Sequence, residues 1–161
     1  MSPVERRRRI LAALSVPIRI YLGLVFIYAA VYKIAEPYDF ALAVATYQIA
    51  PLALINIFAV ILPWVELVTG TALIAGFWTK ENATLILLMM LVFIFALSIV
   101  LCTGRELGCG CFASEDAAKE ISGLTLVRDL FWTALAAFLI LFDDGRYGVD
   151  GLLRRRRIQN A

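Results

Sequence analysis

Residues 83–103, ATLILLMMLVFIFALSIVLCT, form an apolar run that contains no charged residue. A helix needs about 20 predominantly apolar residues to cross the roughly 30 Å hydrocarbon core of a bilayer. In lipid, a single run of this length satisfies its backbone hydrogen bonds by forming a helix. The stretch therefore predicts a membrane-spanning helix, and the rest of the chain repeats the pattern.

Three further apolar segments are long enough to span, at residues 17–34, 52–78 and 126–142. The whole chain is 62% hydrophobic and 17% charged, whereas soluble domains are about 45–50% apolar and about 25% charged. We therefore predict an all-α fold: an integral membrane four-helix bundle in a single domain, residues 1–161, with basic tails at 1–16 and 143–161. Four arginines before the first span would also suit a signal peptide, but no clear cleavage site follows, so an uncleaved span is preferred.

The segment between Pro37 and Pro51 is apolar but too short to span, at about 1.5 Å per residue. It predicts a short interfacial or re-entrant helix after the first span. Lys and Arg gather on the cytoplasmic side of membrane proteins. Eleven of the 15 lie in the two tails, at Arg19 and at Lys80. This distribution predicts cytoplasmic termini, a multi-pass protein of the cytoplasmic (inner) membrane, and an extracytoplasmic loop at 104–125.

The chain contains no histidine and three cysteines. A Ser-His-Asp or Cys-His triad is therefore excluded, and three cysteines fall one ligand short of the usual structural zinc site. No metal site is predicted. The arginine runs flank membrane spans, so no nucleic-acid partner is expected.

Cys109 and Cys111 lie in the polar loop GRELGCGCFASED, residues 104–116, with Gly110 between them. A disulfide between residues two apart departs from preferred geometry, and strained, exposed disulfides tend to be labile. Such a bond is also a poor staple, because it closes almost no loop. We interpret the pair as a catalytic thiol–disulfide couple. The alternatives are two small residues in a turn, pairing with other thiols, or metal ligation.

Cys102, near the outer end of the third span, is either a resolving thiol for this pair or a small buried apolar residue. Lys33, Arg105 and Arg128 are expected at the same level of the membrane. Nearby cations raise the fraction of thiolate in a cysteine. The alternative for Lys33 and Arg105 is that their side chains only reach toward the lipid headgroups.

Glu66 lies in the middle of the second span, where a carboxylate is costly and indicates a functional site. It is expected to be protonated or paired with another span. Arg128 and Asp129 are adjacent, so one of them should face the bundle. For these residues, interhelical hydrogen bonding and a proton or quinone site both remain open. Four small residues are interpreted as helix-packing positions: Gly70, Ala72, Ala75 and Gly76.

Four stretches resemble a known group of membrane proteins. LGLVFIYAAVYKIAEPYDFALAVATYQIAP (22–51) and LPWVELVTGTALIAGFW (62–78) resemble the DoxX-type four-helix proteins. LGCGCFAS (107–114), followed by LVRDLFWTALAAF (126–138), is similar to the MauE branch, methylamine utilisation protein E. There a CGCFG-like motif precedes a helix that begins with Arg-Asp. This chain has Ala113 where the family usually has glycine.

The resemblance implies a redox-associated four-helix bundle that acts with a thioredoxin-like partner in forming disulfides in exported enzymes. It implies that Cys109 and Cys111 are the functional pair, supported by Lys33, Glu66, Arg128 and Asp129. The leading hypothesis is a membrane thiol–disulfide oxidoreductase without a covalently bound cofactor, linked to quinone as electron carrier. The alternatives are an accessory or anchor subunit of a larger membrane redox complex, and a small-solute transporter that uses Glu66.

Overall fold

The computed structural model describes residues 2–46, 51–102, 123–152 and 156. Within these ranges the regular structure is helical and no strand occurs: α1 (Pro3–Ala35), α2 (Pro37–Thr46), α3 (Leu52–Ala75), α4 (Thr79–Cys102) and α6 (Gly123–Phe142). Four of the helices, α1, α3, α4 and α6, are long and apolar enough to cross a membrane. The predicted all-α fold with four spans is confirmed, and the chain is a multi-pass membrane protein.

Helix α1 begins at Pro3, well before the predicted start of the span at residue 17. The Glu5 N–H donates to Ser2 Oγ at 3.3 Å, and the Ser2 N–H donates to Glu5 Oε2 at 3.1 Å. This reciprocal capping box satisfies two N–H groups that the helix leaves unpaired, and proline suits a first helical position. The basic segment is therefore helical, a result that hydropathy alone does not predict.

Helices α1 and α2 meet at a proline. The Glu36 N–H donates to Tyr32 O at 3.0 Å, after which Pro37 has no N–H to continue α1 and instead opens α2. The predicted short helix after the first span is therefore present. Its residue Phe40 is buried against the bundle.

Helix α3 ends at Ala75, three residues before the predicted limit of the second span. Gly76 has φ +68°, and the N–H groups of Gly76 and Phe77 donate to Leu73 O and Ala72 O at 3.1 and 3.0 Å. A left-handed residue of this kind stops a helix, and glycine adopts it without strain. The turn brings the chain directly into α4.

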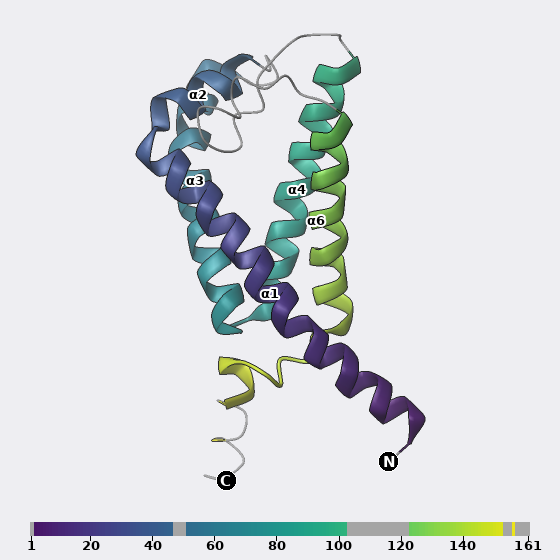
Figure 1. The fold of residues 1–161 in the computed structure, drawn as a ribbon. Coiled ribbons are helices and arrows are strands. Elements are labelled where there is room, and N and C mark those ends of the chain that lie inside the picture. Colours follow the sequence, from purple (N-terminus) through teal and green to yellow (C-terminus); the bar gives the residue numbers. More distant parts are fainter. Residues whose placement is uncertain (1, 47–50, 103–122, 153–155, 157–161) are drawn as a thin grey trace.

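The helices form two closely packed pairs, α1 with α3 and α4 with α6. Figure 1 shows that the pairs diverge toward the end of the bundle that carries α2, where α4 ends and α6 begins. We call this the α2 end. A buried cluster drawn from all four spans joins the pairs; it includes Leu22, Leu73, Ile86 and Leu139. Between α1 and α3, a Cβ on Gly23 would lie 2.7 Å from Gly70 O, so the backbones touch there.

The opposite end of the bundle is closed by a buried ion pair. Arg19 Nη1 lies 3.4 Å from Asp143 Oδ2, and Arg19 Nη2 donates to the Tyr147 carbonyl. Gly76 and Gly148 are in such close contact that a Cβ on either would meet the other's backbone at 2.8 Å. Arg19 therefore holds the segment after α6 against the end of α3. It was predicted only as one of the cytoplasmic positive charges.

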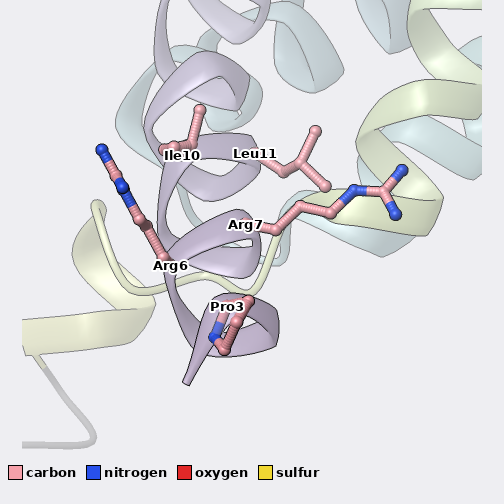
Figure 2. Close-up of a pocket in the computed structure, with 5 residues that line it drawn as sticks. All are labelled: Pro3, Arg6, Arg7, Ile10 and Leu11. Carbon is pink, nitrogen blue, oxygen red and sulfur yellow. The ribbon is translucent and has the colours of Figure 1, made fainter. Parts of the chain in front are cut away.

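The first turns of α1 extend beyond the bundle at this same end. Figure 2 shows Arg6 and Arg7 leaving the helix on different sides, with Leu11 on the side of Arg7. Together with Pro3 and Ile10 they line a surface pocket of about 380 Å³. Both arginines are exposed. The pocket is formed by α1 alone, far along the chain from the polar residues of the spans.

Candidate functional site

Lys33 and Glu66 form an ion pair between α1 and α3. The Lys33 Nζ donates to Glu66 Oε1 at 2.6 Å and to Oε2 at 2.9 Å. Each residue is only 5% exposed. Lys33 Nζ also lies 5.0 Å from the centroid of the Phe40 ring of α2, a cation–π arrangement. Of the alternatives for Glu66, pairing with another span is the one the structure supports. The idea that Lys33 only reaches toward the headgroups is wrong, because its ammonium is buried and bonded.

Arg128 and Asp129 form a second pair on α6. Asp129 is the member that faces the bundle, at 1% exposure. The Arg128 Nε donates to Asp129 Oδ1 at 3.1 Å, and its guanidinium carbon lies 4.7 Å from the centroid of the Trp132 ring. Although neighbouring positions point in different directions on a helix, the long arginine side chain reaches back to its neighbour.

The two pairs belong to one polar cluster. The Lys33 charge acts electrostatically on the Asp129 carboxylate, and all four residues line the same cavity of about 400 Å³. Helices α1, α3, α4 and α6, together with α2, contribute its walls. We name Lys33, Glu66, Arg128 and Asp129 the tetrad. It is a charge-balanced group of two cations and two carboxylates inside a bundle of membrane spans, toward the α2 end.

One atom of the tetrad lacks a partner. Asp129 Oδ2 is buried and accepts no hydrogen bond from any residue that the structure describes. Buried polar atoms in proteins are usually paired, so an exception calls for a reason. The Asp129 carboxylate can therefore accept a hydrogen bond or hold a proton at Oδ2. Within the described ranges, no group of three or more acidic or cysteine residues is placed to hold a metal.

Not all of the predicted site residues can be compared with the structure. Cys109, Cys111 and Arg105 lie outside the described residues. Cys102, the last residue of α4, is exposed. The alternative that it is a small buried apolar residue is therefore wrong, whereas a role as a resolving thiol stays a prediction.

Sequence reasoning missed the aromatic partners of the tetrad. Phe40 and Trp132 pack against the cations, although neither was singled out. A signal was present for Trp132, which follows Arg128 by four positions and so lies on the same helical face. No comparable signal existed for Phe40, because its contact with Lys33 depends on how α2 folds back over α1.

A family described as methylamine utilisation protein MauE matches residues 8–142 of the chain. The methylamine utilisation protein MauE of Paracoccus denitrificans is 32% identical over 120 residues, covering 74% of this chain and 64% of the relative. The protein of the same name from Methylophilus methylotrophus is 26% identical over 121 residues, with the same coverage. This chain thus spans less than two thirds of the length of these relatives.

No solved structure is significantly similar to this chain. The match supports the MauE part of the resemblance, while the wider relationship to DoxX-type proteins stays a prediction. The matched range begins inside α1 and ends with the last residue of α6. It therefore includes the tetrad, the cavity and the segment with Cys109 and Cys111.

Proposed function

We propose that this chain, which belongs to the family of methylamine utilisation protein MauE, is a membrane thiol–disulfide oxidoreductase. Cys109 and Cys111 alternate between a dithiol and a disulfide. They exchange with a soluble thioredoxin-like protein, and their electrons pass to or from a quinone in the bilayer. The names of the relatives connect those proteins with methylamine utilisation, and we extend the connection to the exported enzymes that this chain would serve.

The observation that carries the proposal is the position of the tetrad relative to the two helix ends that flank the cysteine segment in the chain. Helix α4 ends at Cys102 and α6 begins at Gly123, both at the α2 end (Figure 1). The segment that contains Cys109 and Cys111 is therefore attached at both ends to the part of the bundle that holds the tetrad. Arg128 is only five positions into α6. Cations near a thiol favour the reactive thiolate, which supports an active couple.

The exchange step conserves atoms and electrons. A thiolate of the reduced pair attacks a disulfide of the partner and expels one partner thiolate, forming a mixed disulfide. The second cysteine of the pair then displaces the other partner thiolate. The pair leaves as a disulfide and the partner as a dithiol. The reverse sequence oxidises the partner, and Cys102 would serve as a third thiol if the mixed disulfide persists.

The proposal includes a location. The excess of Lys and Arg in both tails supports cytoplasmic termini and an extracytoplasmic cysteine segment in the cytoplasmic membrane. Disulfides persist in such oxidising compartments. Arg105 would lie beside the pair at this surface.

The test is to trap the redox state of the pair in intact cells. A membrane-impermeant alkylating agent is applied with and without mild reduction, and the labelled cysteines are mapped by mass spectrometry. We expect Cys109 and Cys111 to be labelled only after reduction, and the Cys109→Ser/Cys111→Ser variant to lose thiol exchange with a thioredoxin-like protein. Ser114→Ala is the matched control, because it changes a residue near the pair in sequence and leaves all three thiols in place.

Full exchange activity in the double variant would contradict the proposal. A pair that is permanently reduced, or unreachable from outside, would do so as well. In those cases an accessory or anchor subunit of a larger membrane redox complex becomes the better assignment. That role predicts a stoichiometric complex that survives the loss of both thiols.

A further inference from the structure

The cavity between the two helix pairs has walls of unusual composition. It measures about 400 Å³, inside the range of about 300–1,000 Å³ in which proteins bind small molecules. Aromatic rings from five helices line it, at Phe26, Phe40, Phe58, Phe93 and Trp132. Aromatic side chains prefer offset or edge-to-face contact with other rings. The walls are therefore suited to a planar ring system.

Exposed lining residues on α3 and α4 indicate that the cavity opens sideways, between these two helices. Among its lining residues, Phe58 is 55% exposed and Val92 is 70% exposed. Both belong to membrane-spanning helices, so their exposed surfaces face hydrocarbon. A ligand dissolved in the bilayer can therefore enter laterally without crossing water.

The polar end of the cavity is charge-balanced. Lys33 is paired with Glu66 and Arg128 with Asp129. An anionic or cationic ligand would upset one of these pairs in a medium where unpaired charge is costly. A neutral ligand with oxygen atoms avoids that cost. The buried Asp129 Oδ2, which has no partner among the described residues, can accept a hydrogen bond from a hydroxyl of such a ligand.

We propose that this cavity binds the ring of a lipid-soluble quinone, with Asp129 as the side chain that hydrogen-bonds one ring oxygen. A quinone is planar, neutral when oxidised and when fully reduced, and dissolves in the bilayer. The isoprenoid tail would leave through the opening between α3 and α4. This inference rests on the proposed function only for the source of the electrons; the binding site stands on the cavity.

The dithiol and the quinone exchange equal numbers of electrons and protons. The dithiol of Cys109 and Cys111 gives up two electrons and two protons and becomes a disulfide. The quinone takes up two electrons and two protons, so that both carbonyls become hydroxyls. Because the dithiol supplies both protons, Asp129 keeps its charge and its pairing with Arg128 throughout. Its Oδ2 accepts a hydrogen bond from the adjacent hydroxyl once the ring is reduced. The reverse reaction returns the same groups to their starting state.

The test measures binding directly, with decylubiquinone as the probe. The full chain, reconstituted in nanodiscs with Trp64→Phe and Trp78→Phe, retains Trp132 as its tryptophan at the cavity. We expect decylubiquinone to quench Trp132 fluorescence saturably. Decylubiquinol, the reduced probe, is measured by its competition with decylubiquinone. Asp129→Asn should weaken the binding of decylubiquinol by about tenfold or more, because its ring hydroxyl loses a hydrogen bond to a charged group. Asp144→Asn, an exposed aspartate at the other end of the bundle, should bind as before.

Two further experiments distinguish specific binding of the ring from misfolding and from binding of lipid chains. Ala96→Trp fills the cavity from α4 and should abolish saturable retention of radiolabelled decylubiquinone, even if Asp129→Asn does not fold. Retention replaces fluorescence for this variant, because the new tryptophan would add its own emission. Decanol, which has the tail length but no ring, should not compete. Equal affinity in all variants, or equal competition by decanol, would overturn the proposal and indicate a site for lipid chains.

Quinone binding and thiol exchange are separate properties, and each can be absent without the other. Binding is measured in the Cys109→Ser/Cys111→Ser variant as well, where it should be unchanged. If the unsubstituted chain binds decylubiquinone normally but has no thiol-exchange activity, the proposed function is overturned and this inference stays intact. Normal exchange in a chain that binds no decylubiquinone would do the opposite.

Discussion

Lys33 on α1 and Glu66 on α3 are joined by two short hydrogen bonds, of 2.6 and 2.9 Å, between residues that are each only 5% exposed. The ion pair connects the two helices of one packed pair at the level where the cavity begins. Lys33 also contacts the Phe40 ring of α2, and both partners line the same cavity as Asp129 of α6. The pair therefore sets the geometry of the polar cluster as well as stabilising it.

Breaking this pair from one side should destabilise the protein strongly. Lys33→Met leaves the Glu66 carboxylate buried without its partner, a loss of about 3–5 kcal/mol in the free energy of unfolding. The double variant Lys33→Met/Glu66→Leu should recover much of that loss, since neither charge remains. Denaturant titration in detergent micelles measures the free energy of unfolding of both variants, with the exposed Lys80→Met as control. Equal stability of the single and double variants would contradict this prediction, because it would mean that Lys33 and Glu66 do not stabilise each other.

Close approach of α1 and α3 depends on the absence of side chains at Gly23 and Gly70. Because a Cβ on Gly23 would lie 2.7 Å from Gly70 O, Gly23→Val must push the backbones apart. Overpacking of this kind costs about 1–3 kcal/mol. Gly123→Val is the matched control, because among the described residues no atom outside its own stretch of helix lies within 4 Å of a Cβ at that position. Thermal unfolding of the two variants should differ, and identical midpoints would contradict the close contact.

Arg19 should govern the stability of the segment that follows α6. In Arg19→Met, Asp143 and the Tyr147 carbonyl lose their donor, and a hydrogen bond to a charged group is worth about 1.5–3 kcal/mol. We expect the Asp150 amide, which donates to Gly76 O, to exchange with deuterium at least about tenfold faster. Hydrogen exchange followed by mass spectrometry measures this rate. Arg6→Met, on the exposed first turns of α1, should leave the rate unchanged.

The orientation predicted from Lys and Arg can be tested at two exposed positions on opposite ends. In a chain whose three cysteines are replaced by serine, Glu36→Cys precedes α2 and Lys80→Cys lies in the first turn of α4. An impermeant maleimide applied to intact cells should label the first and not the second, if both termini are cytoplasmic. Labelling of Lys80→Cys alone would reverse the topology and place the cysteine segment in the cytoplasm.

Much of the fold could be predicted from local properties of the sequence. The run at 83–103 and its three counterparts correspond to the four spans, because hydropathy adds up along a single helix and needs no information about its neighbours. The predicted positions of the helix ends were less accurate. The capping box at Ser2 and the left-handed Gly76 shift two of them, since these depend on individual hydrogen bonds that an apolar average does not register.

The sequence by itself determined that Glu66 and either Arg128 or Asp129 would lie inside the membrane, since each falls within an apolar run. Only the tertiary structure decided that Glu66 meets Lys33, that Asp129 is the buried member of its pair, and that one cavity joins them. These contacts depend on the rotation of each helix about its axis and on the angle at which helices cross. Both are set by packing such as that of Gly23 against Gly70, which brings together residues far apart in the chain.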